Sequence, residues 1–550
     1  MLILGYGGSI HDFSYCLMED NHIICAIEEE RISREKYAIG PKSLIARGSK
    51  YCLTVDGVHI HPDMVIANDL LPDQFVQTHA GNALKINHHL SHAAGVFYTS
   101  GYQEAAILIA DGRGSDLING NIETVSFYYA RDNDIKLLDR VEGNEIKLDV
   151  PYFKEHFSID EIYTNSIGDF YSVMTRVVGF HKNEDGKLMG LAPYGTDKLV
   201  PWLQKYVHLC PNGHITVEYD TSFYEGIEKI LKDCSADIMD QHRLDLAYAT
   251  QFITEKAMLH MAGHLYQLTG CKNICLGGGV ALNSVLNGKI AQKTPFQDVY
   301  IMPASGDSGT SLGAALYGYY AIHKAPREEA VCIPNAYLGK PYSNESILQV
   351  LEENREKLHF SYLSTDKLCE RAAESLAENK ILGWFQGRSE FGPRALGSRS
   401  ILANACHPDM KDILNARVKF REAFRPFAPS VLKEYAKDYF EIDCQESPYM
   451  LKVFPVRKDK RKLLPSITHV DGSARVQTVS KEDNEIYYQL IDCFRRRSGV
   501  PVILNTSFNI KGEAIVESPL DAVHCFLTTN IDILYIGNYE VIKNNEYNVF

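Results

Sequence analysis

The chain of 550 residues is longer than one ordinary hydrophobic core supports, so its length predicts two or three domains. Hydrophobic residues make up 45% of the chain and charged residues 23%, a composition typical of a globular protein in water. The net charge of −14, from 56 basic and 70 acidic residues, disfavours a nucleic-acid-binding protein with a global basic surface, although a local basic patch stays open.

The cysteines and the apolar segments bear on the compartment. The 13 cysteines include no Cys-x-x-Cys pair, which is typical of reduced, mostly buried thiols. The opening MLILGYGGS has no charged leader and only a very short apolar run, so we do not expect a signal peptide. No stretch is long and apolar enough to cross a bilayer. The sequence therefore predicts a cytoplasmic protein that does not bind a membrane.

Strands and helices alternate along the first part of the chain. Residues 1–31 read as strand, glycine turn, strand, turn and strand, and residues 105–116 read as a strand that ends in an acidic, glycine-rich loop. Residues 272–292 read as strand, triple-glycine turn and helix, and residues 298–320 as strand, polar loop and helix. This alternation predicts α/β layers.

Three prolines and mixed charges interrupt the pattern over residues 321–346, where we place a domain boundary. The predicted domains are 1–330 and 331–550. The second contains the strand KILGWFQ, the segment PVILNTSFN and a last helix, in which Ser518 fits the N-cap, Pro519 the first turn and Asp521 the third position. The basic run at 457–462 is expected to be a solvated loop rather than a nucleic-acid contact.

The stretch NHHLSHAAG, residues 87–95, holds three histidines. In a helix over 88–98, His88 and His92 share one face, with Cβ atoms about 5–6 Å apart, and His89 points elsewhere. Two imidazoles at this spacing can bind one divalent metal ion. A polar, hydrogen-bonded pair in a core helix is the alternative.

Two aspartates follow predicted strands in the same way. Asp111 precedes a glycine-rich loop, and Asp307 lies in PASGDSGTS. The carboxyl ends of strands gather around the ligand crevice in α/β folds, so these carboxylates are candidates to join the histidines. Such a ligand set suits iron, zinc or manganese, whereas turn or helix-cap roles are the structural alternative.

Two glycine loops, GYGGS at 5–9 and LGGGVALN at 276–283, also follow apolar strands. Glycine lets backbone N–H groups approach phosphate oxygens, and the helix N-terminus that follows favours anions. Each loop alone is more typical of a plain tight turn, but the pair is what an actin-like ATPase fold uses to hold a nucleotide. Three polar features lie close in sequence to the first loop and are candidates for a role in its site: His11, Lys36 and the acidic run 28–30. A surface hairpin is the alternative.

Cationic side chains concentrate between residues 388 and 425 of this acidic protein. Apolar residues and prolines separate them, and guanidinium groups match phosphate and carboxylate geometry. A binding site for a multiply charged anion is therefore expected, with structural salt bridges as the alternative. The cations are Arg388, Arg394, Arg399, Arg417, Lys419, Arg421 and Arg425. SARVQT (473–478) and LNTSFN (504–509) are candidate partners for a second anionic or carbonyl group.

A resemblance to a known family runs along nearly the whole chain. The motifs GYGGSIHDFS, EEERISREK, HHLSHAAGVFY, GKLMGLAPYG, LGGGVALNS, PASGDSGTSLGAA, FGPRALGSRS, FRPFAPS and NTSFNIKGE resemble, in order, those of the O-carbamoyltransferases of antibiotic and nodulation-factor biosynthesis. The resemblance implies a duplicated, actin-like ATPase (ASKHA-type) fold over 1–330, related to the tRNA threonylcarbamoyl transferases. It also implies a YrdC-like α/β domain over 331–550.

The family reaction has two steps. The resemblance implies that the second domain joins carbamoyl phosphate and ATP into carbamoyladenylate, and that the first domain transfers the carbamoyl group to a hydroxyl of a small-molecule acceptor. The implied cofactors are ATP and a divalent metal, iron in the family, with zinc, manganese or magnesium as alternatives. Carbamoyl phosphate, ATP and a hydroxylated acceptor are the expected partners, without nucleic acid, and a homodimer is left open.

The resemblance also assigns residues, by motif. His88, His92, Asp111 and Asp307 match metal ligands, and His11 and Lys36 match the transfer site. Residues matching positions that bind the nucleotide or carbamoyl phosphate are Gly277, Gly278, Gly279, Asn283, Arg388, Arg394, Lys419, Arg425, Arg475, Asn505 and Ser507. Ser115 stands where an acidic residue is expected. Two other functions stay open: a tRNA-modifying transferase of related sequence, and a non-enzymatic regulator that binds nucleotide and metal.

Overall fold

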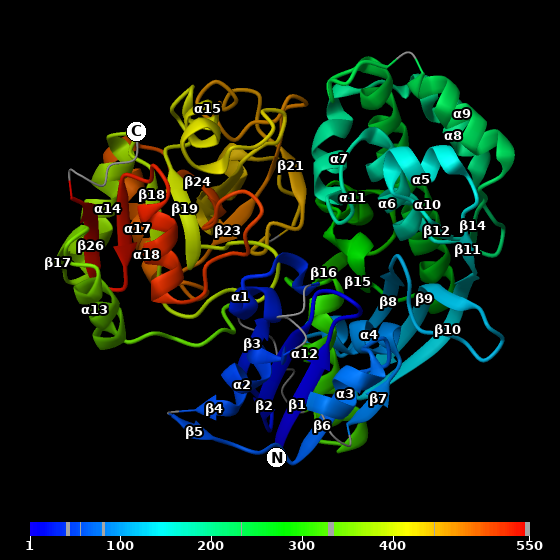
Figure 1. Cartoon of the computed structure of the whole chain (residues 1–550), viewed down its shortest axis with the longest axis horizontal. Coiled ribbons are helices and arrows are strands. Elements are labelled where there is room, and N and C mark those ends of the chain that lie inside the picture. The colour runs from blue at the N-terminus through cyan, green and yellow to red at the C-terminus, as the bar shows by residue number, and fades with distance from the viewer. Residues whose placement is uncertain are drawn as a thin grey trace. The chain divides into compact units, whose positions relative to one another are not determined.

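The computed structural model describes residues 1–39, 45–55, 57–79, 83–232, 234–327, 335–444 and 446–544 (Figure 1). The chain forms two compact units. The first unit comprises Met1–Leu4, Ile10–Asp63 and Ile333–Phe550, and the second comprises Gly5–Ser9 and Met64–Cys332. The expected boundary between residues 330 and 331 lies outside the described residues, and the division of labour between 1–330 and 331–550 stays a prediction.

Two five-stranded sheets repeat one strand order. The first runs β3-β2-β1-β6-β7 and the second β10-β9-β8-β15-β16, so that each starts with its third, second and first strands and ends with its fourth and fifth. In both sheets the early strands include antiparallel pairs and the last two strands run parallel. This repetition confirms the predicted α/β class and the duplicated, actin-like fold. The strands are β1 (Leu2–Gly7), β2 (Ser14–Glu19), β3 (His22–Glu28), β6 (Met64–Asn68), β7 (Leu84–Ile86), β8 (Glu104–Ala110), β9 (Ile122–Arg131), β10 (Asp134–Gly143), β15 (Asn273–Gly277) and β16 (Asp298–Ile301).

Helices α4 (His88–Tyr98) and α12 (Thr310–Tyr317) pack against each other in the second unit. Glycine makes this approach possible, because a Cβ atom on Gly313 would lie 1.8 Å from the carbonyl oxygen of Ser91. The other described helices of seven or more residues in this unit are α3 (Asp73–His79), α5 (Pro151–Phe157), α6 (Ile167–Val178), α7 (Asp185–Leu191), α9 (Thr221–Leu231), α10 (Gln241–Thr269) and α11 (Ser284–Lys293).

An eight-stranded sheet, ordered β17-β26-β25-β18-β19-β24-β20-β23, forms the centre of the C-terminal part of the first unit. Successive side chains of β18 (Leu382–Phe385), the expected strand KILGWFQ, point to opposite faces. Trp384 joins a core with α14 (Thr365–Ala377) and α17 (Glu485–Ser498), and Phe385 joins one with α13 (Asn344–Glu353) and α18 (Pro519–Leu527). The other strands are β17 (Leu358–Tyr362), β19 (Arg399–Ala403), β20 (Ala428–Leu432), β23 (Gln477–Val479), β24 (Val502–Ser507), β25 (Ile533–Ile536) and β26 (Tyr539–Lys543).

The predicted start of the last helix is confirmed. Ser518 is the N-cap of α18, Pro519 opens the helix, and Ser518 and Asp521 form a capping box. The cysteines that the structure describes are all free thiols. Among the described helices, none combines the length and the apolar character that crossing a bilayer requires.

Candidate functional site

The cluster of histidines and aspartates in the second unit is built from three elements. Helix α4 begins at His88 because the Asn87 side chain caps it, accepting a hydrogen bond from the Leu90 N–H at 2.8 Å. His88 and His92 thus face the same side, one turn apart. Asp111 follows β8, and Asp307 opens the short helix η7 (Asp307–Gly309) after β16.

The four side chains meet with their donor atoms within 4.8 Å of one another. The two Nε2 atoms of His88 and His92 lie 3.1 Å apart, and Asp111 Oδ2 lies 3.4 and 3.2 Å from them. Asp307 Oδ1 lies 3.6 Å from His88 Nε2. Ligand atoms about 2.0–2.2 Å from one metal ion are separated by about 3 Å, so the geometry and the donor types both fit a divalent cation.

Electrostatics agree with this fit. Burial by itself lowers the pKa of the His88 imidazole, but the hydrogen bonds and charges of Asp111 and Asp307 outweigh it and raise this pKa to about 10. Burial and the charge of Asp307 raise the pKa of Asp111, yet the two histidines bring it down to about 2. The carboxylates therefore favour a positive charge at the imidazoles, which a bound cation also satisfies.

Two further residues contact His88: Asn68 at the ring, which sequence reasoning missed, and Ser115 at the backbone N–H. Asn68 Oδ1 lies 3.4 Å from His88 Nδ1, and Asn68 Nδ2 donates to the Gly8 carbonyl at 2.6 Å and to Thr310 at 2.9 Å. Ser115 Oγ accepts from the His88 N–H at 2.9 Å and donates to Asp69 at 2.7 Å. Like Asp111, Asn68 ends a strand, which was the available signal.

His89 is not part of the cluster of His88, His92, Asp111 and Asp307. Its Nδ1 lies 2.7 Å from the Ser126 hydroxyl, and its ring is so close to Gly114 that a Cβ atom there would lie 2.5 Å from Nε2. Burial, followed by the charge of His88, lowers the pKa of His89 to about 3, so this ring is neutral. His89 is therefore a packed neighbour of the cluster.

The second glycine loop lies beside Asp111. The Gly279 N–H lies 3.4 Å from Asp111 Oδ1, and Gly278 has a φ of 85°, which favours glycine. A Cβ atom on Gly278 would lie 2.2 Å from the Ala110 carbonyl oxygen. Gly277 is the last residue of β15, so the three glycines carry the chain past the end of β8.

Asn283 has a structural setting. Its side chain caps α11 by accepting from the Leu286 N–H at 3.1 Å, and it exchanges two hydrogen bonds, of 3.0 and 3.1 Å, with Gln251 of α10. Its amide therefore ties two helices together, whatever it contributes to a nucleotide site.

His11 and Lys36 lie in the first unit, in segments that contact each other. The Asp12 N–H donates to the Tyr37 carbonyl at 2.7 Å, and His11 Nδ1 lies 2.9 Å from Asp12 Oδ2. Lys36 Nζ donates to the Glu513 carbonyl at 3.5 Å. The acidic run 28–30 extends from the end of β3 into α1 (Glu29–Ser33), and Glu28 and Glu29 are buried rather than on a surface hairpin.

A cation cluster occupies the C-terminal part of the first unit. Burial, then repulsion from Arg425, lowers the pKa of Arg394 to about 10 and that of Arg421 to about 9. Burial and the charge of Arg394 lower the pKa of Arg475 well below its usual range. Among the described residues, Nε of Arg394 and Nε of Arg475 have no hydrogen-bond partner. Repelling, unsatisfied guanidinium groups are what an anion site requires.

Lys419 completes this cluster. It is buried, and its ammonium donates to the Ser507 carbonyl, to Ser507 Oγ at 3.3 Å and to Asn509 Oδ1 at 2.9 Å. Burial, then the charge of Arg421, lowers its pKa well below the usual value. Asn505 Nδ2 donates to Gln477 at 3.1 Å, and its buried Oδ1 has no partner among the described residues.

Three other arginines of the expected anion site bind protein groups instead. Arg388 donates to the carbonyls of Gly339 and Ile24, each at 2.5 Å. Arg399 donates to the Gln386 carbonyl at 2.9 Å, and Arg417 pairs with Asp532 at 2.6 Å. The contacts of these three residues are structural, because protein groups already satisfy their guanidinium groups.

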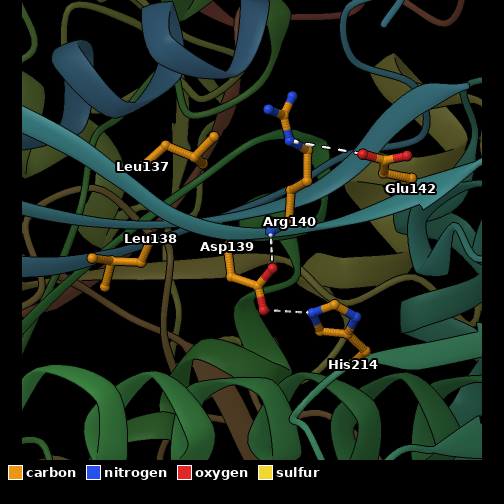
Figure 2. A pocket seen from close by; sticks show the side chains of 6 residues that line it. All are labelled: Leu137, Leu138, Asp139, Arg140, Glu142 and His214. Atoms are coloured by element: carbon orange, nitrogen blue, oxygen red, sulfur yellow. Dashed lines mark hydrogen bonds and ion pairs between the residues drawn. The ribbon is translucent and has the colours of Figure 1, made fainter. Parts of the chain in front are cut away.

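A separate pocket of about 460 Å³ lies along β10 (Figure 2). Figure 2 shows the Asp139 carboxylate between the Arg140 backbone N–H, at 2.8 Å, and the His214 ring, at 2.7 Å. None of the residues that the sequence singled out lines this pocket; it is lined by Leu137, Leu138, Asp139, Arg140, Glu142 and His214.

Comparisons with known proteins cover both halves of the chain. The model of the carbamoyltransferase N-terminus matches residues 65–316, and that of the carbamoyltransferase C-terminus matches residues 373–543. The nodulation protein NolNO of Sinorhizobium fredii is 36% identical over 97% of this chain and 79% of its own. The nodulation protein NolO of Bradyrhizobium diazoefficiens is 37% identical over 83% of this chain and 79% of its own.

Further relatives include an uncharacterized protein of Synechocystis, 33% identical over 98% of this chain and 96% of its own. Among solved structures, full-length HypF in the phosphate- and nucleotide-bound form has a TM-score of 0.41 at 14% identity. The match covers 60% of this chain and 47% of the HypF chain. The two family models and the end-to-end relatives show that the chain belongs to the carbamoyltransferase family of enzymes.

Proposed function

We propose that this carbamoyltransferase is ATP-dependent, that it makes carbamoyladenylate from carbamoyl phosphate and ATP, and that it carbamoylates a hydroxyl of a small-molecule acceptor. The observation that carries the proposal is the cation cluster. Arg394, Arg421, Arg425 and Arg475 repel one another, and two of them keep unsatisfied Nε donors. Such a cluster suits substrates that carry several negative charges, and carbamoyl phosphate and ATP both do.

The chemistry balances in two stages. Carbamoyl phosphate reacts with water to give carbamate and phosphate, and a carbamate oxygen attacks the α-phosphorus of ATP, which forms carbamoyladenylate and expels pyrophosphate. The acceptor hydroxyl then attacks the carbamoyl carbon, the C–O bond to AMP breaks, and the hydroxyl proton leaves. The mixed anhydride is useful because AMP is a better leaving group toward a weak hydroxyl nucleophile than the phosphate of carbamoyl phosphate.

The residues of the first unit have defined roles in this proposal. Arg394, Arg425 and Arg475 bind and orient phosphoryl oxygens. Lys419, whose N–H donors are taken by Ser507 and Asn509, orders that segment of the chain. His11 accepts the proton of the acceptor hydroxyl, and Asp12, 2.9 Å from His11 Nδ1, favours the tautomer with the proton on that nitrogen.

His88, His92, Asp111 and Asp307 are the residues that would hold a divalent metal, of the iron type by family resemblance. When bound, that cation would supply positive charge to offset the charge of a nucleotide phosphate. The Gly277–Gly279 loop offers the Gly279 N–H next to Asp111. These residues of the second unit position the adenylate and exclude water from it.

Pyrophosphate release tests the proposal. Purified protein supplied with ATP, carbamoyl phosphate and metal, without acceptor, is expected to release pyrophosphate. Arg394→Ala should abolish this half-reaction, whereas His88→Ala should leave it in place and block transfer. No pyrophosphate from metal-replete wild-type protein would refute the adenylation step. Equal loss in both variants would refute the assignment of the two sites.

Mass spectrometry should detect the carbamoyl mass on hydroxylated acceptors.

A further inference from the structure

The acidic and basic residues 28–34 hold a loop that carries part of the cation cluster. Glu28 Oε1 accepts a hydrogen bond from the Gly392 N–H, and Arg31 Nη2 donates to the Gly392 carbonyl at 2.8 Å. Both side chains are buried. The backbone N–H and the backbone carbonyl of Gly392 are therefore both hydrogen-bonded. Gly392 lies two positions before Arg394. Gly392 has a φ of 121°, which only glycine adopts without strain, so this backbone has a defined, unusual conformation.

Arg34 holds a second loop in the same manner. Its Nη1 donates to the Ile515 carbonyl at 2.6 Å and its Nη2 to the Ala514 carbonyl at 2.7 Å. Its Nε lies 3.7 Å from Asp521 Oδ1. The planar guanidinium thus fixes two consecutive peptide groups at once, which the single ammonium of lysine does not reproduce.

This second loop supports Lys419. The carbonyl of Glu513, directly before the residues that Arg34 binds, accepts from Asn509 Nδ2 at 2.8 Å. Asn509 Oδ1 in turn accepts from Lys419 Nζ at 2.9 Å. A continuous series of hydrogen bonds and one peptide step therefore connects Arg34 with the buried ammonium of the cluster.

Stability alone is a poor explanation for these contacts. Removing charged groups from water costs about as much free energy as their pairing returns, so buried ion pairs add little net stability. Their geometric effect is larger, because several fixed donors hold the cation-bearing loops in one conformation before the anion arrives.

We propose that Glu28, Arg31 and Arg34 are positioning residues for the cation cluster, so that phosphate affinity depends on a segment more than 350 positions away in the sequence. They act through Gly392 and through the loop at 513–515, not by touching the substrate. The identity of the anion as carbamoyl phosphate rests on the proposed function, whereas the positioning itself does not.

Arg34 is the residue to test, because its side chain is 29% exposed and its substitution leaves no isolated charge in the core. Arg34→Lys keeps the positive charge but removes the planar pair of N–H donors, and Arg34→Ala removes both the charge and the donors. Arg243→Lys, in the second unit, is the matched control, because Arg243 Nη1 donates to the Val178 carbonyl at 2.7 Å and the substitution changes the same kind of hydrogen bond. Inorganic phosphate is the probe, measured by calorimetry on the full chain.

Both Arg34 variants are expected to raise the phosphate dissociation constant about tenfold, because losing the one or two hydrogen bonds that hold the 513–515 loop leaves the cluster less ordered before phosphate binds. Cobalt affinity at the His88 cluster should stay unchanged, and so should phosphate affinity in Arg243→Lys. In turnover, the KM for carbamoyl phosphate should rise more than kcat falls. Unchanged phosphate affinity in folded Arg34→Ala, or an equal loss in Arg243→Lys, would overturn the inference.

The two proposals fail separately. Phosphate binding that weakens in the Arg34 variants supports the positioning role even if wild-type protein releases no pyrophosphate, and in that case only the adenylation reaction is refuted. Wild-type protein that releases pyrophosphate while its Arg34 variants bind phosphate normally refutes only the positioning role. Wild-type protein that binds no phosphate would overturn the inference directly.

Discussion

The side chain of Asn68 connects the cluster of His88, His92, Asp111 and Asp307 to neighbouring residues. Its Oδ1 lies 3.4 Å from His88 Nδ1 and its amide nitrogen binds Gly8 and Thr310, so it orients the imidazole. Outer contacts of this kind are worth about 10–100-fold in metal affinity. We expect Asn68→Ala to weaken cobalt binding by that factor in a spectroscopic titration. Asn273→Ala, an exposed amide bound to the Glu104 carbonyl at 3.4 Å, should leave it unchanged; equal affinities in both variants would contradict the role of Asn68.

The charge on Arg421 predicts how anion binding depends on pH. Burial, then the charge of Arg425, lowers the pKa of Arg421 to about 9, so this side chain is protonated at neutral pH and loses its charge as the pH rises through that value. Sulfate affinity should therefore be greatest near neutral pH and fall toward about pH 10, while sulfate itself keeps its charge. Calorimetry at several pH values measures this. In Arg421→Met the same loss should be smaller, and an identical pH profile would contradict the assignment.

Individual site residues were predictable only where local sequence determines their neighbours. His88 and His92 are four positions apart on one helix, and Asp111 and Asp307 each follow a strand, so their meeting followed from periodicity and topology. The hydrogen bonds of Arg388 to Gly339 and Ile24, and those of Asn283 to Gln251, join distant segments. No local pattern distinguishes such a guanidinium from one that binds an anion.

At the scale of elements, the capping box of α18 is a sequence feature with a measurable effect. Ser518 Oγ accepts from the Asp521 N–H at 3.2 Å, and Asp521 Oδ2 accepts from the Ser518 N–H at 2.9 Å. Ser518→Ala is expected to lower the free energy of unfolding by about 0.5–2 kcal/mol. Chemical denaturation measures the change. Ser518→Asp, which keeps an acceptor at the N-cap, should lose less, and an equal loss would show that the hydrogen bond is not responsible.

Other elements show the limit of local rules. The strand, turn and strand pattern of residues 1–31 and the helix over 88–98 are confirmed, because alternation and an N-cap residue are local signals. The π-helix η9 (Asn415–Lys419), which carries Lys419, has no such signal. It ends at Phe420 with a φ of 45°, a conformation that contacts elsewhere in the fold impose on a bulky residue.

For the molecule as a whole, metal binding should add to stability. A ligand that binds only the folded chain raises its stability by RT ln(1 + [L]/Kd), which amounts to about 2.7 kcal/mol at a hundredfold excess over Kd. Chelation of metal-loaded protein is therefore expected to lower the melting temperature in calorimetry. In Asp307→Asn the chelator should have a smaller effect, and an undiminished effect would place the metal elsewhere.

At the scale of the whole chain, sequence patterns do not show which distant segments pack together. Composition placed a break near residues 321–346, and family resemblance divided the chain into consecutive halves. The compact first unit combines Ile10–Asp63 with Ile333–Phe550, held by contacts such as the hydrogen bond from the Ala26 N–H to the Leu338 carbonyl at 2.9 Å, and the division into 1–330 and 331–550 stays a prediction. Such pairings depend on tertiary packing, which neither composition nor periodicity encodes.

The four clustered ligands, at positions 88, 92, 111 and 307, also carry a consequence for biogenesis. During synthesis the two histidines and the first aspartate leave the ribosome long before Asp307 does. A complete coordination sphere therefore cannot form until nearly all of the second unit has been made and folded. An ion captured early would be held by three ligands only. Bringing Asp307 to them closes a long loop, which has an entropic cost. If the proposed metal binds here, its tight retention would report that the second unit has finished folding.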